Sequence, residues 1–426
     1  MERFIGLIGY VLILGIAVLL SNNRRAINWN LVVRGLIVQL LLALFILKTT
    51  IGKTLFAYIG AGITKLLAFS DAGAKFVFGV LVDQETLRDK LGASNGFIFV
   101  VQIAPTIIFV AALVSMLYHL GIMQRVVSLI ARGVHYIMPV SGAEALSNVA
   151  SAFVGQVEAQ IMIKPYIKGM TRSELLASMA GSMACIAGGV MAVYIKFGIP
   201  AEYLLAASVM AAPAALVISK IVYPETETSE TKGFVKLEVA SENANVLDAL
   251  SHGAGDGMKI SINIMAMLIA FIAVVALIDY ALGGIGTGLY NIGISPSIVG
   301  FDMQTLSLKT ILGGFFSLFA WVMGVPSQDV YTAVGLMGTK MVINEFVAYY
   351  DMKDLIAKNV LQPKTIAIVS FALCGFANFS SVAMQIGGIG QLAPERRADL
   401  AKLGFKALIC GTLASYLSAT VAGILF

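Results

Sequence analysis

The stretch Val154-Gly-Gln-Val-Glu-Ala-Gln160 places one carboxylate and two amides inside an otherwise apolar part of the chain. Two similar stretches follow, Ile343-Asn-Glu-Phe-Val-Ala348 with Glu345 and Cys374-Gly-Phe-Ala-Asn-Phe-Ser-Ser381 with Asn378. A carboxylate at membrane depth costs a few kcal/mol on insertion scales, so a segment retains one only where it faces a cavity, a partner or a ligand. We therefore expect the three stretches to converge on one transport site.

The composition excludes a soluble protein. Of the 426 residues, 58% are hydrophobic and only 12% are charged, whereas a water-facing surface needs about a quarter to a third of its positions charged. We predict an integral membrane protein, in which basic residues of short cytoplasmic loops explain the net charge of +5 without a nucleic-acid partner. Three scattered cysteines and three scattered histidines form no metal or nucleophile motif, which argues against an enzyme and predicts no cofactor.

Apolar segments of membrane-spanning length alternate with shorter or more polar ones. We expect an all-α membrane protein with about eight transmembrane helices, two re-entrant hairpins and interfacial helices. The spans are expected at 4–20, 31–49, 97–118, 173–195, 199–219, 258–282, 363–388 and 404–425. Interfacial helices are expected where charges interrupt the apolar pattern, at 50–96, 119–139 and 304–322.

The hairpins are predicted from apolar pieces that are too short to cross a bilayer. Such pieces flank the polar residues within 142–170 and around Asn344 and Glu345. This pattern is typical of a re-entrant hairpin whose tip is buried in protein or lines a cavity. The alternative interpretation is that the hairpins are surface loops, in which case Glu158 and Glu345 are merely solvated.

A charged segment at 220–257 separates two halves in which the same order recurs: span, interfacial helix, hairpin, broken span, span. Counting the crossings makes the second half inverted relative to the first. The positive-inside rule then places basic clusters such as Arg24-Arg25 and Arg396-Arg397 in the cytoplasm and both termini outside. Inverted repeats of this kind bind a polar solute near the membrane midplane. We expect that solute to be uncharged, because no intramembrane Lys or Arg is apparent near the two carboxylates.

Several of these polar residues also have a purely structural interpretation. Asn344 can cap a half-helix, and Ser380 and Ser381 can bond back to a carbonyl one turn earlier. Phe376 can be a packing residue. Cys374 and Cys410 are most simply small apolar residues.

The chain resembles the concentrative nucleoside transporter family, and closely its bacterial branch. The likeness covers nearly the whole chain and is carried by Gly155-Gln-Val-Glu158, Asn344-Glu-Phe-Val-Ala348 and Phe376-Ala-Asn-Phe-Ser-Ser381. It implies a homotrimer in the lipid bilayer that imports nucleosides such as uridine across a bacterial inner membrane, with both termini periplasmic. The import would be driven by a sodium or proton gradient.

The resemblance also implies a fixed scaffold and a transport domain that moves in an elevator-like way. The scaffold falls on 1–118 and 258–303, and the transport domain on 119–219 and 304–426, with 220–257 as a cytoplasmic linker. By position, the nucleobase contacts fall on Gln156, Val157, Glu158 and Val190. The ribose contacts fall on Glu345, Asn378 and Ser381, and Phe376 lies between the nucleoside and the cation. The cation site falls on Ser151, Val154, Cys185 and Ile186.

Three residues depart from the family's usual pattern. Sodium-coupled members usually have Asn at the position of Ser151 and Ser at that of Cys185. A thiol is a poor ligand for a hard cation, so sodium would depend on backbone carbonyls and on Ser151. Ser at that first position also resembles some proton-coupled bacterial members. Val157 replaces a usual Thr or Ser, which is expected to weaken base recognition or change which base is accepted.

Two other classes of function are considered. An elevator-type carrier for another polar, uncharged metabolite would share the repeat but should lack the second and third motifs, and competition by uridine distinguishes it. A channel would conduct without saturation, and a membrane-bound enzyme would alter its ligand chemically. No nucleophile with an adjacent base or metal is apparent in the sequence.

Overall fold

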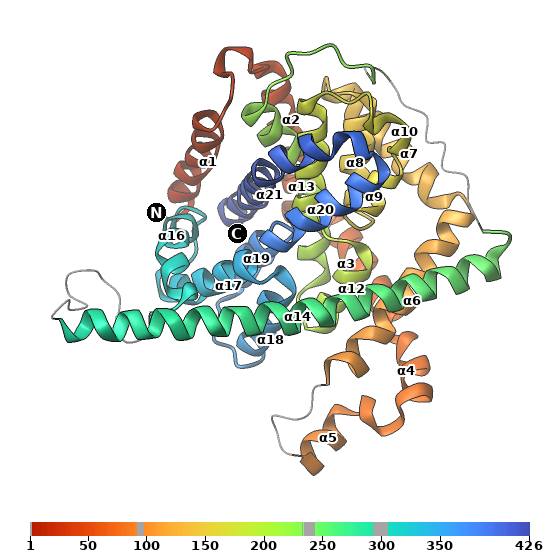
Figure 1. Ribbon diagram of the computed structural model, residues 1–426, viewed down its shortest axis with the longest axis vertical. Helices are drawn as coiled ribbons and strands as arrows, with labels where there is room; N and C mark the ends of the chain where they lie inside the picture. Colours follow the sequence, from red (N-terminus) through yellow and green to blue (C-terminus); the bar gives the residue numbers. More distant parts are fainter. Residues whose placement is uncertain (1, 92–97, 232, 234–242, 293–305) are drawn as a thin grey trace.

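The structure is a computed structural model that describes all residues except 1, 92–97, 232, 234–242 and 293–305. The described part contains helices and no strands (Figure 1). Parts of three predicted segments, 50–96, 220–257 and 258–303, lie outside the described residues, as does the start of 304–322.

The N-terminal third forms helices at the predicted places. The expected spans correspond to α1 (Glu2–Leu19), α2 (Trp29–Lys48) and α6 (Phe99–His119). The more polar segment between α2 and α6 forms α3 (Thr50–Ala68), α4 (Ser70–Phe78) and α5 (Gln84–Leu91). Of these, α3 packs beside α2, and α4 packs against α6.

The first hairpin follows the amphipathic helix α7 (Ile122–Ile137). Its first arm is α8 (Gly142–Ser151), which begins at a capping box between Ser141 and Glu144. Its return arm consists of two single turns, α9 (Glu158–Ile161) and α10 (Lys164–Ile167). We expected one half-helix there, but Pro165 lacks the N–H that would continue the hydrogen-bond ladder.

The order of hairpin, broken helix and long helix occurs twice. In the first copy the hairpin precedes α11 (Arg172–Ala184), α12 (Gly188–Lys196) and α13 (Ala201–Val222). In the second copy α16 (Leu308–Val322) leads to the hairpin α17 (Val330–Val342) and α18 (Glu345–Ala357). The broken helix α19 (Pro363–Leu373) and α20 (Phe379–Leu392) and the final α21 (Arg397–Leu425) complete it.

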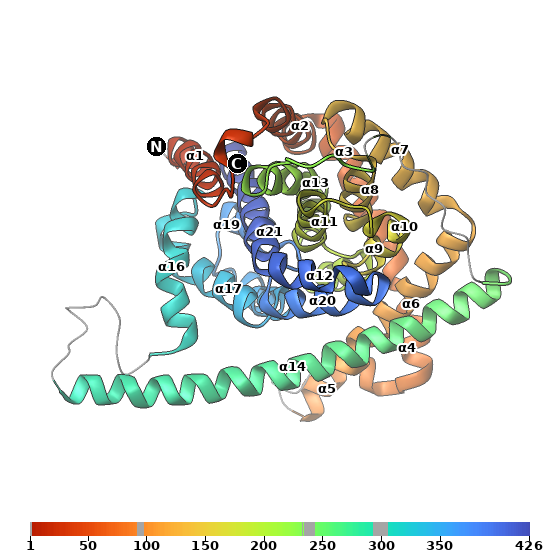
Figure 2. The same cartoon turned by 45° about the horizontal axis from the view of Figure 1, so that its top comes forward.

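The two broken helices meet at their breaks. Gly375 has a φ of +95°, and a Cβ there would lie 2.5 Å from the backbone of Ala184 at the end of α11. Only glycine fits this conformation and this close approach. In Figure 2, α11 and α13 lie in the middle of the body, and both pack against α21.

The helix α14 is longer than the sequence indicated. We expected a linker up to residue 257 and a span at 258–282, but α14 runs from Val246 to Asn291. Its first turns pack closely on α6, where a Cβ on Gly253 or Gly257 would lie 2.5–2.6 Å from α6 atoms. The charges that suggested a linker, from Glu225 to Glu242, precede this helix in the sequence. Its own residues Lys259 and Asp256 pair with each other at 3.0 Å. Small residues one turn apart let the two backbones approach and extend the helix contact.

Six helical segments of the described chain are long and apolar enough to cross a membrane: 29–48, 100–119, 172–196, 201–222, 246–291 and 394–425. Shorter apolar helices lie at 5–19 and 363–373. Together these are the eight segments in which spans were expected. The chain is therefore built as a membrane protein.

Candidate functional site

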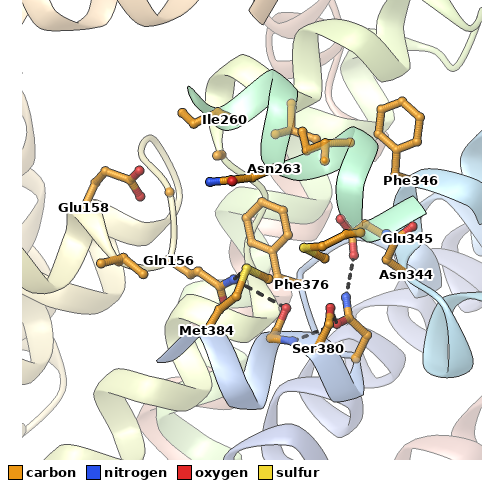
Figure 3. A pocket seen from close by; sticks show the side chains of 18 residues that line it. Gln156, Glu158, Ile260, Asn263, Asn344, Glu345, Phe346, Phe376, Ser380 and Met384 are labelled. Carbon is orange, nitrogen blue, oxygen red and sulfur yellow. Dashed lines mark hydrogen bonds between the residues drawn. The ribbon is translucent and has the colours of Figure 1, made fainter. Parts of the chain in front are cut away.

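A cavity of about 210 Å³ lies between the two hairpin tips, the breaks of the two broken helices and α14 (Figure 3). All eight residues predicted to contact the substrate line it: Gln156, Val157, Glu158, Val190, Glu345, Phe376, Asn378 and Ser381. Residues of both hairpin tips share this cavity, and Glu345 is buried, so its carboxylate is not solvated as the surface-loop alternative had it. Figure 3 shows Glu158 and Glu345 on opposite sides, with Phe376 between them.

At one end of the cavity, the carboxylate of Glu345 is held by two donors. The amide of Asn378 donates to it at 2.9 Å, and the hydroxyl of Tyr194 donates to it at 3.2 Å. Glu345 is only 4% exposed. It is the first residue of α18, which Asn344 caps by accepting from the N–H of Val347 at 3.0 Å. An acceptor that is buried and already oriented at a helix N-terminus is suited to bind hydroxyl donors of a ligand.

Asn378 performs two tasks at the start of α20. Its side-chain oxygen accepts from the N–H of Ser381 at 2.9 Å and from the hydroxyl of Ser380 at 2.7 Å, which caps the helix. Its amide N–H group donates to Glu345. The structural interpretation of Ser380 predicted a bond from its hydroxyl to a carbonyl one turn earlier. The hydroxyl instead donates to the side-chain oxygen of Asn378. The break between α19 and α20 thus holds the carboxylate of Glu345 in the second hairpin in place through Asn378.

At the other end, Gln156 links the first hairpin to α20. Its amide donates to the hydroxyl of Ser381 at 3.4 Å, and its oxygen accepts from Gln385 at 3.4 Å. Glu158 is exposed, and its carboxylate folds over Gly155, where a Cβ would lie 2.0 Å from a carboxylate oxygen. The methyl groups of Val157 face Gly388 on α20. Glu158 is therefore an accessible acceptor beside an apolar contact.

Lys340 corrects one expectation from the sequence. We expected no cationic side chain near the carboxylates, but Lys340 on α17 is 1% exposed, and its ammonium donates to the carbonyls of Ala372 at 2.9 Å and Cys374 at 3.1 Å. It does not line the cavity. It satisfies carbonyls at the C-terminal end of α19, which lack intrahelical partners. Lys340 lies five residues before Glu345 in an otherwise apolar half-helix. The sequence alone could therefore have indicated it as a polar residue that needs a buried partner.

The residues predicted for the cation lie together at the ends of α8 and α11. All four, Ser151, Val154, Cys185 and Ile186, are buried. The hydroxyl of Ser151 lies 3.0 Å from that of Ser182 on α11 and donates to the carbonyl of Ser147 at 2.7 Å. The thiol of Cys185 donates to the carbonyl of Ser208 at 3.7 Å. A small cation here would therefore use oxygen atoms of Ser151 and of the backbone.

Comparisons with known proteins identify the family. Three family models match successive parts of the chain: the N-terminus of the Na⁺ dependent nucleoside transporters at 8–81, a nucleoside recognition (Gate) domain at 100–201, and the C-terminus of the Na⁺ dependent nucleoside transporters at 203–423. The chain is 37% identical over 420 residues to the nucleoside permease NupC of Helicobacter pylori, covering 98% of this chain and 96% of that protein. The chain belongs to the concentrative nucleoside transporter family.

Two further comparisons agree. Sodium/nucleoside cotransporter 1 of Rattus norvegicus is 37% identical over 440 residues, with 100% of this chain and 64% of that protein covered. The solved structure of CNTnw in an inward-facing substrate-bound state matches with a TM-score of 0.91 at 38% identity, covering 100% of this chain and 98% of that one. The resemblance and the helical fold are confirmed. Membership in a concentrative nucleoside transporter family also excludes the enzyme alternative.

Replacing Lys340 by Met should destabilise the protein, because the carbonyls at the end of α19 lose a buried donor. We expect a loss of about 2–4 kcal/mol, seen as a lower melting temperature of the purified protein in detergent. The matched control is Lys358→Met at an exposed lysine, which should leave the melting temperature unchanged. Equal melting temperatures for the two variants would contradict the role assigned to Lys340.

Proposed function

We propose that this protein is a secondary active transporter that carries nucleosides together with sodium across the inner membrane of a bacterium. The observation that carries the proposal is the shared cavity, in which Glu345, already held by Asn378 and Tyr194, faces Gln156 and Glu158 of the other hairpin. The names of the relatives favour a nucleoside over the other polar metabolites considered above.

The two ends of the cavity suit the two parts of a nucleoside. Glu345, Asn378 and Ser381 would bind the ribose, because a carboxylate accepts from two adjacent hydroxyls and the amide and hydroxyl complete the set. Gln156, Val157, Glu158 and Val190 would contact the base. Phe376 would supply an aromatic face between them. The cationic Lys340 is occupied with carbonyls and does not reach the cavity, so an uncharged ligand is still the better match.

Sodium is the proposed coupling ion. The family description names it, and α8 and α11 both end beside Ser151 and Cys185. Helix C-termini present carbonyl oxygens and partial negative charge, which favour a cation. The thiol of Cys185 adds little to such a site, since hard cations prefer oxygen. A proton is the alternative coupling ion.

The elevator movement is part of the proposal. The scaffold would comprise 1–118 and the long helix α14, and the transport domain 119–219 and 304–426. Support comes from the cavity walls, since α14 forms one wall and the hairpins with the broken helices form the others. In Figure 1, α14 passes along the outside of the body and extends beyond it. Movement of the hairpins along α14 would carry the cavity across the membrane.

The proposed topology places both termini in the periplasm. Gly6 lies so close to Ile424 that a Cβ would be 2.5 Å from that side chain, so the two ends of the chain share one side. At the other end of α1, the N–H of Asn22 donates to Val222, beyond which the charged segment begins. Arg396 donates there to the carbonyls of Ile167, Lys168 and Met170. Basic residues gathered at this end indicate the cytoplasmic side.

A homotrimer is proposed from the family resemblance. In the single chain, α14 leaves large apolar side chains such as Ile269, Leu277 and Tyr280 exposed. Lipid or neighbouring copies of the chain must cover them in the membrane. Native mass spectrometry of the protein released from mild detergent should show three chains of 45.1 kDa. A single chain at every detergent condition would contradict the trimer.

Replacing Glu345 by Gln should abolish concentrative uridine uptake into proteoliposomes, because the neutral amide is a weaker acceptor for the ribose hydroxyls and its NH₂ group opposes that of Asn378. We expect uptake to fall by at least about 100-fold, the effect of losing roughly 3 kcal/mol of charged hydrogen bonding. Asp354→Asn on the exposed face of the same helix is the control and should transport normally. Retention of wild-type uptake in Glu345→Gln would reject the assignment.

Replacing Cys185 by Ser should lower the sodium concentration that gives half-maximal uptake by several-fold, because a hydroxyl is a harder ligand than a thiol. The control is Cys410→Ser, a buried cysteine of α21 that is not among the predicted cation ligands. Wild-type uptake should follow an imposed sodium gradient. Uptake that follows an imposed pH gradient and ignores sodium would instead assign the coupling to protons.

A further inference from the structure

The wall that α14 contributes to the cavity contains one amide among apolar residues. Its lining residues are Ile260, Asn263, Ile264 and Met267. Their spacing of three, four and seven residues places them on one face of the helix. Three of the four are apolar, so Asn263 is the polar exception on this wall.

Asn263 is an unusual residue for its position. It lies in an apolar stretch of a membrane-length helix, where a polar side chain is unfavourable unless it faces a partner or a cavity. Within the part of the chain that the structure describes, its amide forms no hydrogen bond to another protein group, and its side chain is exposed to the cavity. Its hydrogen-bonding groups are thus available to a ligand.

The lining of a second cavity shows at which end of the first cavity Asn263 lies. This neighbouring cavity of 480 Å³ is also lined by Glu158, Val190 and Asn263, but not by Glu345 or Asn378. Asn263 therefore lies toward the end formed by the first hairpin. Figure 3 agrees, since its amide points toward the side of the pocket on which Glu158 lies.

The other side chains that line the first cavity at this end lack free donors. Glu158 as a carboxylate only accepts hydrogen bonds. The amide of Gln156 already donates to Ser381 at 3.4 Å, with the sulfur of Met384 at 3.7 Å, and Val157 has no polar atom. In the neighbouring cavity the hydroxyl of Tyr118 donates to the sulfur of Met162 at 3.1 Å. Of the residues that line the first cavity at this end, Asn263 is thus the one that can present uncommitted N–H donors together with an acceptor.

We propose that Asn263 forms hydrogen bonds to the edge of the nucleobase and helps to determine which base the transporter prefers. This inference rests on the proposed function of the cavity. A side-chain amide offers adjacent donor and acceptor groups, which complement a base edge that also carries both. Asn263 would thereby supply from α14 the polar contact that Val157 does not supply from the hairpin.

The test compares nucleoside binding by the full-length protein in lipid nanodiscs, measured by calorimetry. Asn263→Leu keeps the size of the side chain, removes its hydrogen bonds and suits an apolar helix, so it is expected to fold. The ligands are uridine, cytidine, adenosine and a ribosyl compound with a phenyl ring in place of the base. Ile262→Leu, at an exposed position of α14 that does not line the cavity, is the control.

We expect Asn263→Leu to weaken binding of at least one natural nucleoside by about tenfold, the effect of one or two lost hydrogen bonds. The size of the loss should differ among the three bases. Binding of the phenyl compound should be unchanged, because that ring has no hydrogen-bonding edge. A second variant, Asn263→Asp, keeps the acceptors and removes the donors, and it should change the order of preference among the bases.

Unchanged affinities in both variants would overturn the inference. An equal loss for all ligands, the phenyl compound included, would also overturn it, because it would show a structural role. If the wild-type protein bound none of the four compounds, the proposed function itself would fail and this inference with it. Normal nucleoside binding by the wild type separates the first two outcomes from the third.

Discussion

A carboxylate in the interior of a membrane protein is stable only where donors surround it, and the arrangement around Glu345 meets this requirement. The donors come from Asn378 at the start of α20 and from Tyr194 on α12. Both helices follow the breaks of discontinuous helices, and a third helix begins at Glu345 itself. Helix breaks that meet at one place therefore supply the polar groups that one buried carboxylate needs. Glu345 and Asn378 also line the cavity between the hairpins, where they can bind a ligand.

The two helix breaks differ in whether a lysine of the protein satisfies their carbonyl groups. A helix that ends inside the membrane leaves carbonyls without partners. At the end of α19, the ammonium of Lys340 satisfies the carbonyls of Ala372 and Cys374. At the end of α11, no lysine or arginine within the described chain is bonded to the corresponding turn, and the residues expected to bind sodium lie there. Under the proposed sodium coupling, the transported ion would take at this break the place that the resident lysine takes at the other.

Much of this arrangement was predictable, because polar residues are rare enough in apolar segments to stand out. The two hairpins and the polar residues that line the cavity followed from that rule. Val157, Val190 and Phe376 are apolar, and only the family resemblance assigned them to the site. Other features required three-dimensional contacts. The early start of α14 depends on Gly253 and Gly257 packing on α6, and neighbouring charges concealed it. Lys340 and Asn263 are also polar residues in apolar segments. Neither belongs to a recurring motif like those that contain Glu158 and Glu345, so the sequence analysis did not identify them. The hydrogen bonds already formed by Ser151 and Cys185 are likewise invisible in a sequence.

One nucleoside is expected to be held between the two hairpin tips. A cryo-electron microscopy structure of the wild-type protein in lipid nanodiscs, with saturating uridine and sodium, tests it most directly. Density for the ribose is expected within hydrogen-bonding distance of Glu345 and Asn378, and density for the base is expected beside Gln156 and Glu158. Uridine bound at another place, or an empty cavity under conditions where calorimetry shows full occupancy, would contradict it.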